Sequence, residues 1–314
     1  MMKVLVTGVA GFIGSHLAEY LSKSGNEVIG IDNFNNYYDS SLKRLNASHV
    51  EASGVKVIEA DLRDDLSEIL PNDFDFVYHF AGQPGISNTT TLKEYVDNNI
   101  YATENLLQFV KKNNKNLKLF VNIATSSVYG SIANLPETAE VKPISYYGIT
   151  KFSAEQLVLK MQRMTEIPAC SFRLYSVYGP RERPEKLYTK LIKSIVENKS
   201  FPLYKGSLEH SRSFTYVGDI VQGLAKCIGN ESVCNGEVFN LGSDKEYTTG
   251  DGILLIEKIL GKSTQLEITP PRDGDQLKTT AVIDKVYNSL NYVPQTTFEE
   301  GLKAQVDWYL KYFD

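Results

Sequence analysis

The feature of this sequence that most constrains its fold is a glycine-rich turn near the N-terminus. An apolar, strand-like run at residues 3–7 leads into Gly8-Val9-Ala10-Gly11-Phe12-Ile13-Gly14, and residues 15–21 have helical character. Because Gly8 and Gly11 lack Cβ atoms, the backbone can turn tightly and let a pyrophosphate approach the helix N-terminus, where free N–H groups favour anions. Gly14 allows the helix to lie close to a sheet. The order strand, glycine turn, helix predicts a dinucleotide-binding α/β fold.

The next expected strand supports this prediction and indicates which dinucleotide binds. Residues 27–31 lead to Asp32, about 20 residues after the glycine turn, where a carboxylate can bind the adenosine ribose diol. The same carboxylate repels a 2′-phosphate, so the sequence favours NAD over NADP. A third strand at residues 55–60 is followed by Asp61-Leu62, which either reaches the adenine or forms a surface turn.

Strands and helices continue to alternate, which predicts an α/β fold with a doubly wound parallel sheet, the Rossmann arrangement. The further expected strands are residues 76–80, 117–123, 169–174 and 237–241, and the expected helices are 92–113, 147–164 and 218–228. Residues 1–175 should form the NAD-binding domain, with its sheet completed by about 218–241. Residues 176–217 and 242–314, which carry most of the prolines, should form a smaller C-terminal α/β substrate-binding domain.

Composition and charge exclude several classes of function. The chain of 314 residues carries a net charge of −5, and no run of Lys and Arg exceeds two residues, so neither nucleic acid nor a membrane is an expected partner. No apolar run reaches ~20 residues and no signal-peptide pattern opens the chain, which predicts a cytoplasmic protein. No metal is expected, because these side chains lack ligand spacing: Cys170, Cys227, Cys234, His16, His49, His79 and His210.

A catalytic base is indicated by Tyr147 and Lys151, which lie one helical turn apart on one face of an expected helix. A free tyrosine titrates near pH ~10, so it accepts a proton at neutral pH only where a cation favours the phenolate, and Lys151 is placed to be that cation. Thr125, Ser126 and Ser127 follow an expected strand, at the end of the sheet where ligands bind, and Thr125 is the third candidate catalytic residue. Taken alone, the tyrosine could cover a lysine stem and the hydroxyls could begin a turn; the nucleotide fold favours catalysis.

Together these motifs resemble the extended short-chain dehydrogenase/reductase family, and within it the NAD-dependent nucleotide-sugar 4-epimerases, over essentially the whole chain. Residues 173–184 are similar to that family's Arg-Phe-Phe-Thr-Val-Tyr-Gly-Pro segment, and residues 211–216 to its Arg-Asp-Phe-Thr-Tyr segment. The resemblance implies bound NAD, a UDP-sugar substrate and a homodimer in which the helices at 92–113 and 147–164 pair across a two-fold axis.

The resemblance also implies the residues of the site. Cofactor contacts are expected at Gly8, Gly11, Phe12, Ile13, Gly14, Asp32, Asn33, Asp61, Leu62, Phe80, Ala81, Asn99, Tyr147 and Lys151. Substrate contacts are expected at Pro84, Ser126, Ser127, Ser176, Arg183, Tyr204, Arg212, Arg272 and Asp275. Of these, Arg212 would hold the diphosphate, Tyr204 would pack on the uracil, and Asp275 would accept from the uridine ribose.

The implied reaction inverts C4 of the sugar through a transient ketone. Tyr147 as phenolate removes the 4-hydroxyl proton while hydride passes from C4 to NAD, Thr125 bonds O4, and Lys151 binds the nicotinamide ribose. Hydride returned to the other face of the ketone inverts C4 and regenerates NAD. The related 4,6-dehydratases carry Asp-Glu after the threonine and the uronate decarboxylases a glutamate, whereas this chain has Ser126 and Ser127, so elimination is not expected.

The expected substrate is UDP-glucuronate, converted to UDP-galacturonate. Residues 32–39, 42–43 and 82–86 resemble the UDP-glucuronate 4-epimerases more than the UDP-glucose enzymes. One position departs from that subfamily: an arginine usually follows the Gly-Val pair, and here Ile86 is followed by Ser87, which removes one partner for the uronate carboxylate. The remaining candidates are Arg183, Ser127 and Ser176.

Other functions stay open at this point. One is a 4-epimerase of UDP-glucose or UDP-N-acetylglucosamine. A net NAD-dependent C4 oxidoreductase would release the keto or reduced sugar and exchange NADH with solvent. A non-enzymatic NAD-binding sensor or interaction protein would share the fold, since fold alone does not determine function, but the intact Thr125, Tyr147 and Lys151 argue against it.

Overall fold

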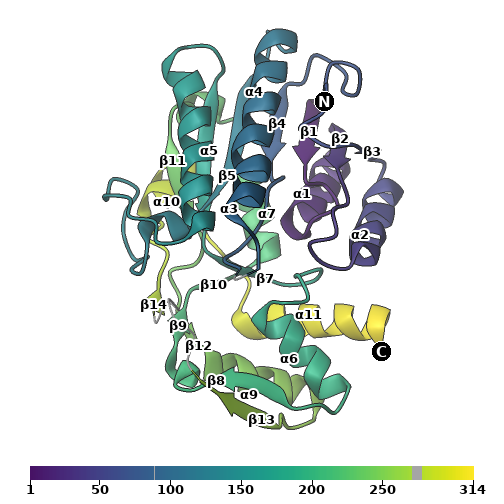
Figure 1. The fold of residues 1–314 in the computed structure, drawn as a ribbon, viewed down its shortest axis with the longest axis vertical. Coiled ribbons are helices and arrows are strands. Elements are labelled where there is room, and N and C mark those ends of the chain that lie inside the picture. Colours follow the sequence, from purple (N-terminus) through teal and green to yellow (C-terminus); the bar gives the residue numbers. More distant parts are fainter. Residues whose placement is uncertain (88, 271–277) are drawn as a thin grey trace.

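Seven parallel strands form the central sheet of the structure, a computed structural model that describes residues 1–87, 89–270 and 278–314. Their order across the sheet is β11-β6-β5-β4-β1-β2-β3 (Figure 1). The strands are β1 (Lys3–Thr7), β2 (Glu27–Asp32), β3 (Lys56–Glu59), β4 (Phe76–His79), β5 (Leu119–Thr125), β6 (Ala169–Leu174) and β11 (Val238–Leu241). Every neighbouring pair is parallel, so all carboxyl ends meet at one edge. The predicted doubly wound parallel sheet is confirmed.

Helices cover both faces of the sheet, which explains why its strands are apolar on both sides. Val4 and Val6 of β1 point into one core, shared with α1 (Phe12–Lys23), α7 (Val217–Ala225) and α10 (Asp284–Leu290). Leu5, between them, points into the opposite core under α4 (Ala102–Asn113) and α5 (Tyr146–Arg163), which lie in front of the sheet in Figure 1. This alternation follows from the two-residue period of a strand.

The strand order reverses between β1 and β4. From β1 the sheet continues through β2 and β3 in one direction and through β4, β5 and β6 in the other, and α2 (Ser40–Ala52) packs on α1 and β3. At the carboxyl ends of the two central strands, Thr7 pairs with His79. Ligands of open α/β sheets bind at such a switch point, so the topology places the candidate site here.

The remaining strands and helices form a layer at the carboxyl edge of the sheet, below it in Figure 1. β7 (Ser176–Tyr178) pairs with β10 (Phe214–Tyr216), β8 (Phe201–Tyr204) with β13 (Leu266–Thr269), and β9 (Ser211–Arg212) with β12 (Tyr247–Thr248) and β14 (Lys278–Thr279). The helices of this layer are α6 (Leu187–Val196), α9 (Thr249–Leu260) and α11 (Phe298–Phe313). Three short elements of the described chain remain besides those at residues 92–101: α8 (Glu231–Cys234) and the 3₁₀ turns η2 (Ser126–Tyr129) and η3 (Ser207–Glu209). Tyr188, Ile256 and Leu302 belong to a separate core between α6, α9 and α11.

The expected continuous helix at 92–113 is interrupted. It consists of α3 (Leu92–Tyr95), a π-helical segment η1 (Val96–Tyr101) and α4. The wider π turns bring Asn99 inward, where it is buried and hydrogen-bonded, which period counting on the sequence does not anticipate. Such π segments occur frequently at functional sites.

The ends of β5 and α7 also differ from the sequence expectation. β5 runs to Thr125, because this residue still pairs with Leu174 of β6, so Thr125 ends the strand instead of following it. α7 ends at Ala225, short of residue 228, because Lys226 to Ile228 bond to carbonyls three residues back in tight turns.

Candidate active site

The glycine turn leaves the N-terminus of α1 open at the switch point. Gly8 has φ +67°, and Gly14 packs so closely on it that a Cβ at residue 14 would overlap the Gly8 carbonyl oxygen. Gly11 is the N-cap of α1, so no side chain caps the helix, and its first turn, which begins at Phe12 and Ile13, carries no acidic residue. Uncapped N–H groups at the positive end of a helix fit a pyrophosphate. This part of the chain therefore fits the expected dinucleotide.

Asp32 ends β2 beside this turn and is oriented by the backbone. Its Oδ2 accepts from the Ala10 N–H at 3.1 Å and its Oδ1 from the Phe34 N–H at 2.9 Å. Lys43 of α2 is buried with its Nζ 4.0 Å from Asp32 Oδ1, and burial lowers the pKa of Lys43 while Asp32 opposes this. A fixed carboxylate with an ammonium beside it fits a ribose diol. Lys43 is thus a candidate cofactor residue that the sequence analysis used only within a resemblance.

Asn33, Asp61 and Leu62 occupy the neighbouring strand ends. The Asn33 amide donates to Asp61 Oδ2 at 2.8 Å, and Arg63 donates to both carboxylate oxygens at 2.8 Å. The bonds from Arg63, and then that from Asn33, outweigh burial and lower the pKa of Asp61 to about 2. The Leu62 side chain is buried in the core beside α4, so only its backbone could meet a cofactor.

A chain of buried hydrogen bonds connects the switch point to the π-helical segment. Thr7 Oγ1 lies 2.8 Å from His79 Nδ1, His79 Nε2 lies 2.9 Å from Thr103 Oγ1, and the Thr103 hydroxyl donates to the Asn99 carbonyl at 2.7 Å. Because Thr103 donates to a carbonyl, it accepts from His79, which assigns the imidazole proton to Nε2. Burial lowers the pKa of His79 to about 3, so this neutral form is the stable one.

Asn99 uses its side-chain amide to hold a loop, residues 82–87, that follows Phe80 and Ala81. The amide oxygen accepts from the Gln83 N–H at 2.7 Å, and the amide nitrogen donates to the Gln83 carbonyl at 3.3 Å and to Thr150 Oγ1 at 3.0 Å. Asn99 therefore fastens the loop to α5. The expected contact of Asn99 with the cofactor stays a prediction.

Tyr147 lies in the first turn of α5, half-buried. Burial raises its pKa, and three groups oppose this: a hydrogen bond from Thr125, then the charge of Arg183, then a hydrogen bond from the Gly85 N–H. Burial lowers the pKa of Lys151 to about 8. Among the charges that act on Tyr147, Arg183 is the first cause of a lower pKa, and the role of Lys151 as the cation that favours the phenolate stays a prediction.

A buried ion pair anchors the helix that carries Tyr147 and Lys151. Arg173 of β6 donates through Nη2 to Glu155 Oε1 at 2.7 Å and through Nε to Oε2 at 3.1 Å, and Ser171 donates to Oε2 at 3.1 Å. Arg173 and Glu155 are 3% and 0% exposed. The first residue of the segment 173–184 therefore has a structural role, because it fixes α5 on the sheet.

The loop at 82–87 meets Arg183 at Gly85. Tyr95 donates to the Gly85 carbonyl at 2.7 Å, and Arg183 lies over the Tyr37 ring with its guanidinium carbon 5.7 Å from the ring centroid. Ser87 is engaged locally, since its Oγ accepts from the N–H groups of residues 89 and 90 at 3.1 and 3.2 Å. Pro84 is half-buried in the same loop.

The other expected substrate residues are spread over the carboxyl edge and the layer below it. Ser126 and Ser127 begin η2, and Ser176 begins β7. Tyr204 ends β8 and is 41% exposed, and Arg212 lies in β9 opposite residues 247 and 279. Arg272 and Asp275 lie outside the described residues. Beside Arg183, the structure adds one residue that the sequence analysis did not name, Lys186, whose charge interacts with both Arg183 and Arg212.

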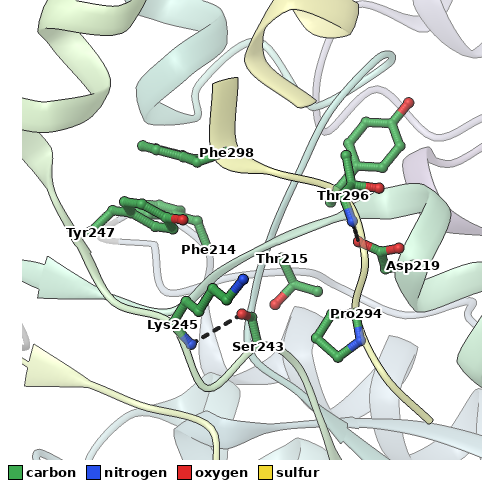
Figure 2. A pocket seen from close by; sticks show the side chains of 10 residues that line it. Phe214, Thr215, Asp219, Ser243, Lys245, Tyr247, Pro294, Thr296 and Phe298 are labelled. Carbon is green, nitrogen blue, oxygen red and sulfur yellow. Dashed lines mark hydrogen bonds between the residues drawn. The ribbon is translucent and has the colours of Figure 1, made fainter. Parts of the chain in front are cut away.

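A small pocket in the lower layer is separate from these residues. Figure 2 shows the rings of Phe214, Tyr247 and Phe298 on one side and Lys245 with Ser243 facing them. The Lys245 N–H donates to Ser243 Oγ at 3.1 Å. The pocket has a volume of ≈ 10 Å³, which is room for about one water molecule. None of the expected site residues lines it, so it is not the site of a nucleotide sugar.

Metal ligands do not cluster in the part of the chain that the structure describes, which omits residues 88 and 271–277. Within these ranges, His, Cys, Asp and Glu form no group of three or more that could hold a metal ion. The helices in the same ranges include none that is long and apolar enough to cross a membrane.

Comparison with known proteins agrees with this geometry. A family model described as GDP-mannose 4,6-dehydratase matches residues 5–305. UDP-glucuronate 4-epimerase 1 of Arabidopsis thaliana is 34% identical over 99% of this chain and 77% of the plant protein. The chain belongs to the extended short-chain dehydrogenase/reductase family.

Two further relatives of this family member are bacterial. Protein CapI of Staphylococcus aureus is 31% identical over 99% of both chains. The crystal structure of UDP-glucuronic acid 4-epimerase from Bacillus cereus, in complex with UDP-glucuronic acid and NAD, is 35% identical, covers 99% of this chain and 100% of its own, and superimposes with a TM-score of 0.90. The Arabidopsis and Bacillus relatives are UDP-glucuronate 4-epimerases, the subfamily that the sequence motifs resemble.

Proposed function

We propose that this protein is an NAD-dependent 4-epimerase that converts UDP-glucuronate to UDP-galacturonate. The observation that supports the proposal is that Thr125 ends β5 at the carboxyl edge of the sheet and that Thr125 and the charge of Arg183 both lower the pKa of Tyr147. The UDP-glucuronate 4-epimerases of Arabidopsis and Bacillus, similar over nearly the whole chain, support the same reaction.

The residues of the chain perform the proton transfer and the positioning. Tyr147 accepts the proton of the sugar 4-hydroxyl, and Thr125 bonds to the same oxygen and to the phenol. Bound NAD supplies the acceptor for the C4 hydride and returns it. Arg183 and the Gly85 N–H stabilise the phenolate against its burial. A positioned base of this kind contributes about 10²- to 10⁴-fold to the rate.

The family model is described by a dehydratase, but the residues after Thr125 support epimerisation. Elimination of water needs an acid and a base near C5 and C6, and Ser126 and Ser127 carry no carboxyl group. The half-buried Arg183 supports a charged sugar, because a cation held near the reacting phenol offers a partner to a uronate.

We extend the proposal to assembly and location. Exposed apolar side chains on α3, η1 and α5, namely Leu92, Tyr101, Tyr146 and Ile149, support a homodimer. Residues 1–175 with about 218–241 would bind NAD, and 176–217 with 242–314 would bind the nucleotide sugar. A cytoplasmic location belongs to the same proposal and stays a prediction.

The test is product analysis without added cofactor. Purified protein is incubated separately with UDP-glucuronate, UDP-glucose and UDP-N-acetylglucosamine, and products are separated by chromatography. We expect fastest conversion of UDP-glucuronate. Faster turnover of a neutral sugar would reject the uronate, release of a keto sugar with NADH would indicate an oxidoreductase, and no turnover by NAD-loaded protein would favour a sensor.

A further inference from the structure

Two cations converge on the loop that approaches Tyr147. A Cβ placed on Gly85 would lie 3.2 Å from Arg183 Nη2 and 3.9 Å from Lys186 Nζ. Gly85 has φ +73°, and its carbonyl accepts from Tyr95, whose ring centroid lies 6.3 Å from that of Tyr147. Both cations come from the turn before α6, where the Lys186 N–H donates to the Arg183 carbonyl at 3.1 Å. Lys186 therefore reaches the side of the site where the sugar reacts.

The carboxylates near these two cations form no direct ion pair with Lys186 in the described ranges. Glu185, an exposed residue, lies 2.9 Å from Arg183 Nη1 as an ion pair without hydrogen-bond geometry, and this nitrogen has no hydrogen-bond partner among the described residues. Glu182 is buried and accepts from Gln305 at 2.8 Å, and burial raises its pKa to about 7. No carboxylate in the described ranges pairs with Lys186 within 4.0 Å. An ammonium held in this way is suited to an anion of a ligand.

The position Ser87 cannot supply that charge. Its hydroxyl already accepts two N–H groups of its own turn. This chain has Ser87 where the resembling subfamily usually has an arginine, and Lys186 reaches the same loop at Gly85 from another segment.

We propose that Lys186 and Arg183 together bind the carboxylate of the reacting sugar, with Lys186 taking the place of the arginine that this chain lacks at Ser87. This inference rests on the proposed function. The structure of the sugar favours the carboxylate over the diphosphate as the partner. The carboxylate is attached to C5, next to the C4 whose hydroxyl proton Tyr147 accepts. The diphosphate is attached to C1, on the opposite side of the ring. A cation beside Gly85 is thus near the carboxylate.

The test compares Lys186→Met with a matched control, Lys190→Met, an exposed lysine one turn further along. We expect Lys186→Met to raise the KM for UDP-glucuronate roughly tenfold to a hundredfold, the loss typical of a donor to a charged group, with a smaller effect on kcat. UDP affinity by calorimetry and NAD content should not change. Lys190→Met should match the wild type.

Two further variants separate binding from structure. Lys186→Arg should keep a KM near the wild type, and Ser87→Arg added to Lys186→Met should restore most of the lost affinity. An unchanged KM in Lys186→Met, or a parallel loss of UDP affinity that shows a diphosphate contact, overturns the inference while leaving the proposed function intact. A wild type that turns over UDP-glucose but not UDP-glucuronate overturns both.

Discussion

Tyr147 is the residue whose chemistry depends most on its surroundings. Burial raises the pKa of its phenol, so the phenolate has to be stabilised by Thr125, Arg183 and the Gly85 N–H. These three groups come from β5, from the turn before α6 and from the loop at 82–87. A change at any of them should alter proton transfer without touching the tyrosine.

Replacing Tyr147 with Phe should remove nearly all turnover, because it deletes only the oxygen that accepts the proton. We expect a loss of about 10²- to 10⁴-fold in kcat with NAD content and thermal unfolding unchanged. Retention of more than about a tenth of the wild-type rate would show that the proton leaves by another route.

The KM for UDP-glucuronate should rise with pH above about 8. Burial, and the charges of Arg183 and Arg212, lower the pKa of Lys186 to about 8 against the opposing charges of Glu182 and Glu185. Below this pH the ammonium is present and binds the carboxylate; above it the charge is lost and affinity falls. Lys151 and Glu182 also titrate in this range, so the pH profile is compared with that of Lys186→Arg. This variant retains Lys151 and Glu182, and its arginine at position 186 stays charged throughout. Identical pH profiles of KM would contradict the prediction.

At the scale of elements, a buried ion pair positions α5 on the sheet. Glu155 lies one turn after Lys151 and is held by Arg173 of β6, and the carboxylate also raises the pKa of Lys151. The π-helical segment holds α5 from the other side through Asn99 and Thr150. The helix is thus fixed between the sheet and the loop that carries Gly85.

Arg173→Leu should destabilise the fold strongly, because it leaves Glu155 buried without its counter-charge. We expect the free energy of unfolding in urea to fall by about 3–5 kcal/mol. The double variant Arg173→Leu with Glu155→Leu should recover part of this loss, since it removes the unpaired charge as well. The control Lys303→Ala, which breaks the exposed pair with Asp307, should leave the urea midpoint unchanged. Equal shifts of the urea midpoint in Arg173→Leu and Lys303→Ala would show that the buried ion pair does not anchor α5.

At the scale of the whole molecule, the outer surface of α3, η1 and α5 carries exposed apolar side chains that a monomer would leave in water. Tyr101 is 61% exposed and Ile149 45% exposed. η1 and α5 contact one another, so these side chains come from neighbouring elements. An apolar surface shared by two helices suits a two-fold contact between identical chains.

Light scattering should therefore give a mass of about twice 35.2 kDa at micromolar concentration. Ile149→Glu should shift the protein toward the monomer, because the contact would bury an unpaired charge. Leu254→Glu, at an apolar position on α9 in the lower layer that is 65% exposed, should leave the dimer intact. A monomeric wild type would reject the proposed assembly.

Much of the fold follows from patterns that are local in the chain. The glycine turn, Asp32 at the end of β2, the apolar strands and the spacing of Tyr147 and Lys151 each lie within a few residues, so period and residue type predict them. Thr125 was predicted in the same way, although pairing with β6 placed it at the end of the strand itself. The sequence by itself determined the doubly wound sheet and the family.

Only the tertiary structure decided what surrounds the reacting groups. Arg183 and Lys186 meet Gly85 across a long stretch of sequence, and Lys43 of α2 reaches Asp32 at the end of β2. The π-helical turn at Asn99 depends on contacts with Gln83 and Thr150 that no local pattern contains. Electrostatic and hydrogen-bonding environments are sums over groups that are near in space and distant in the chain, which is why local patterns predict the candidate residues but not the charges that act on them.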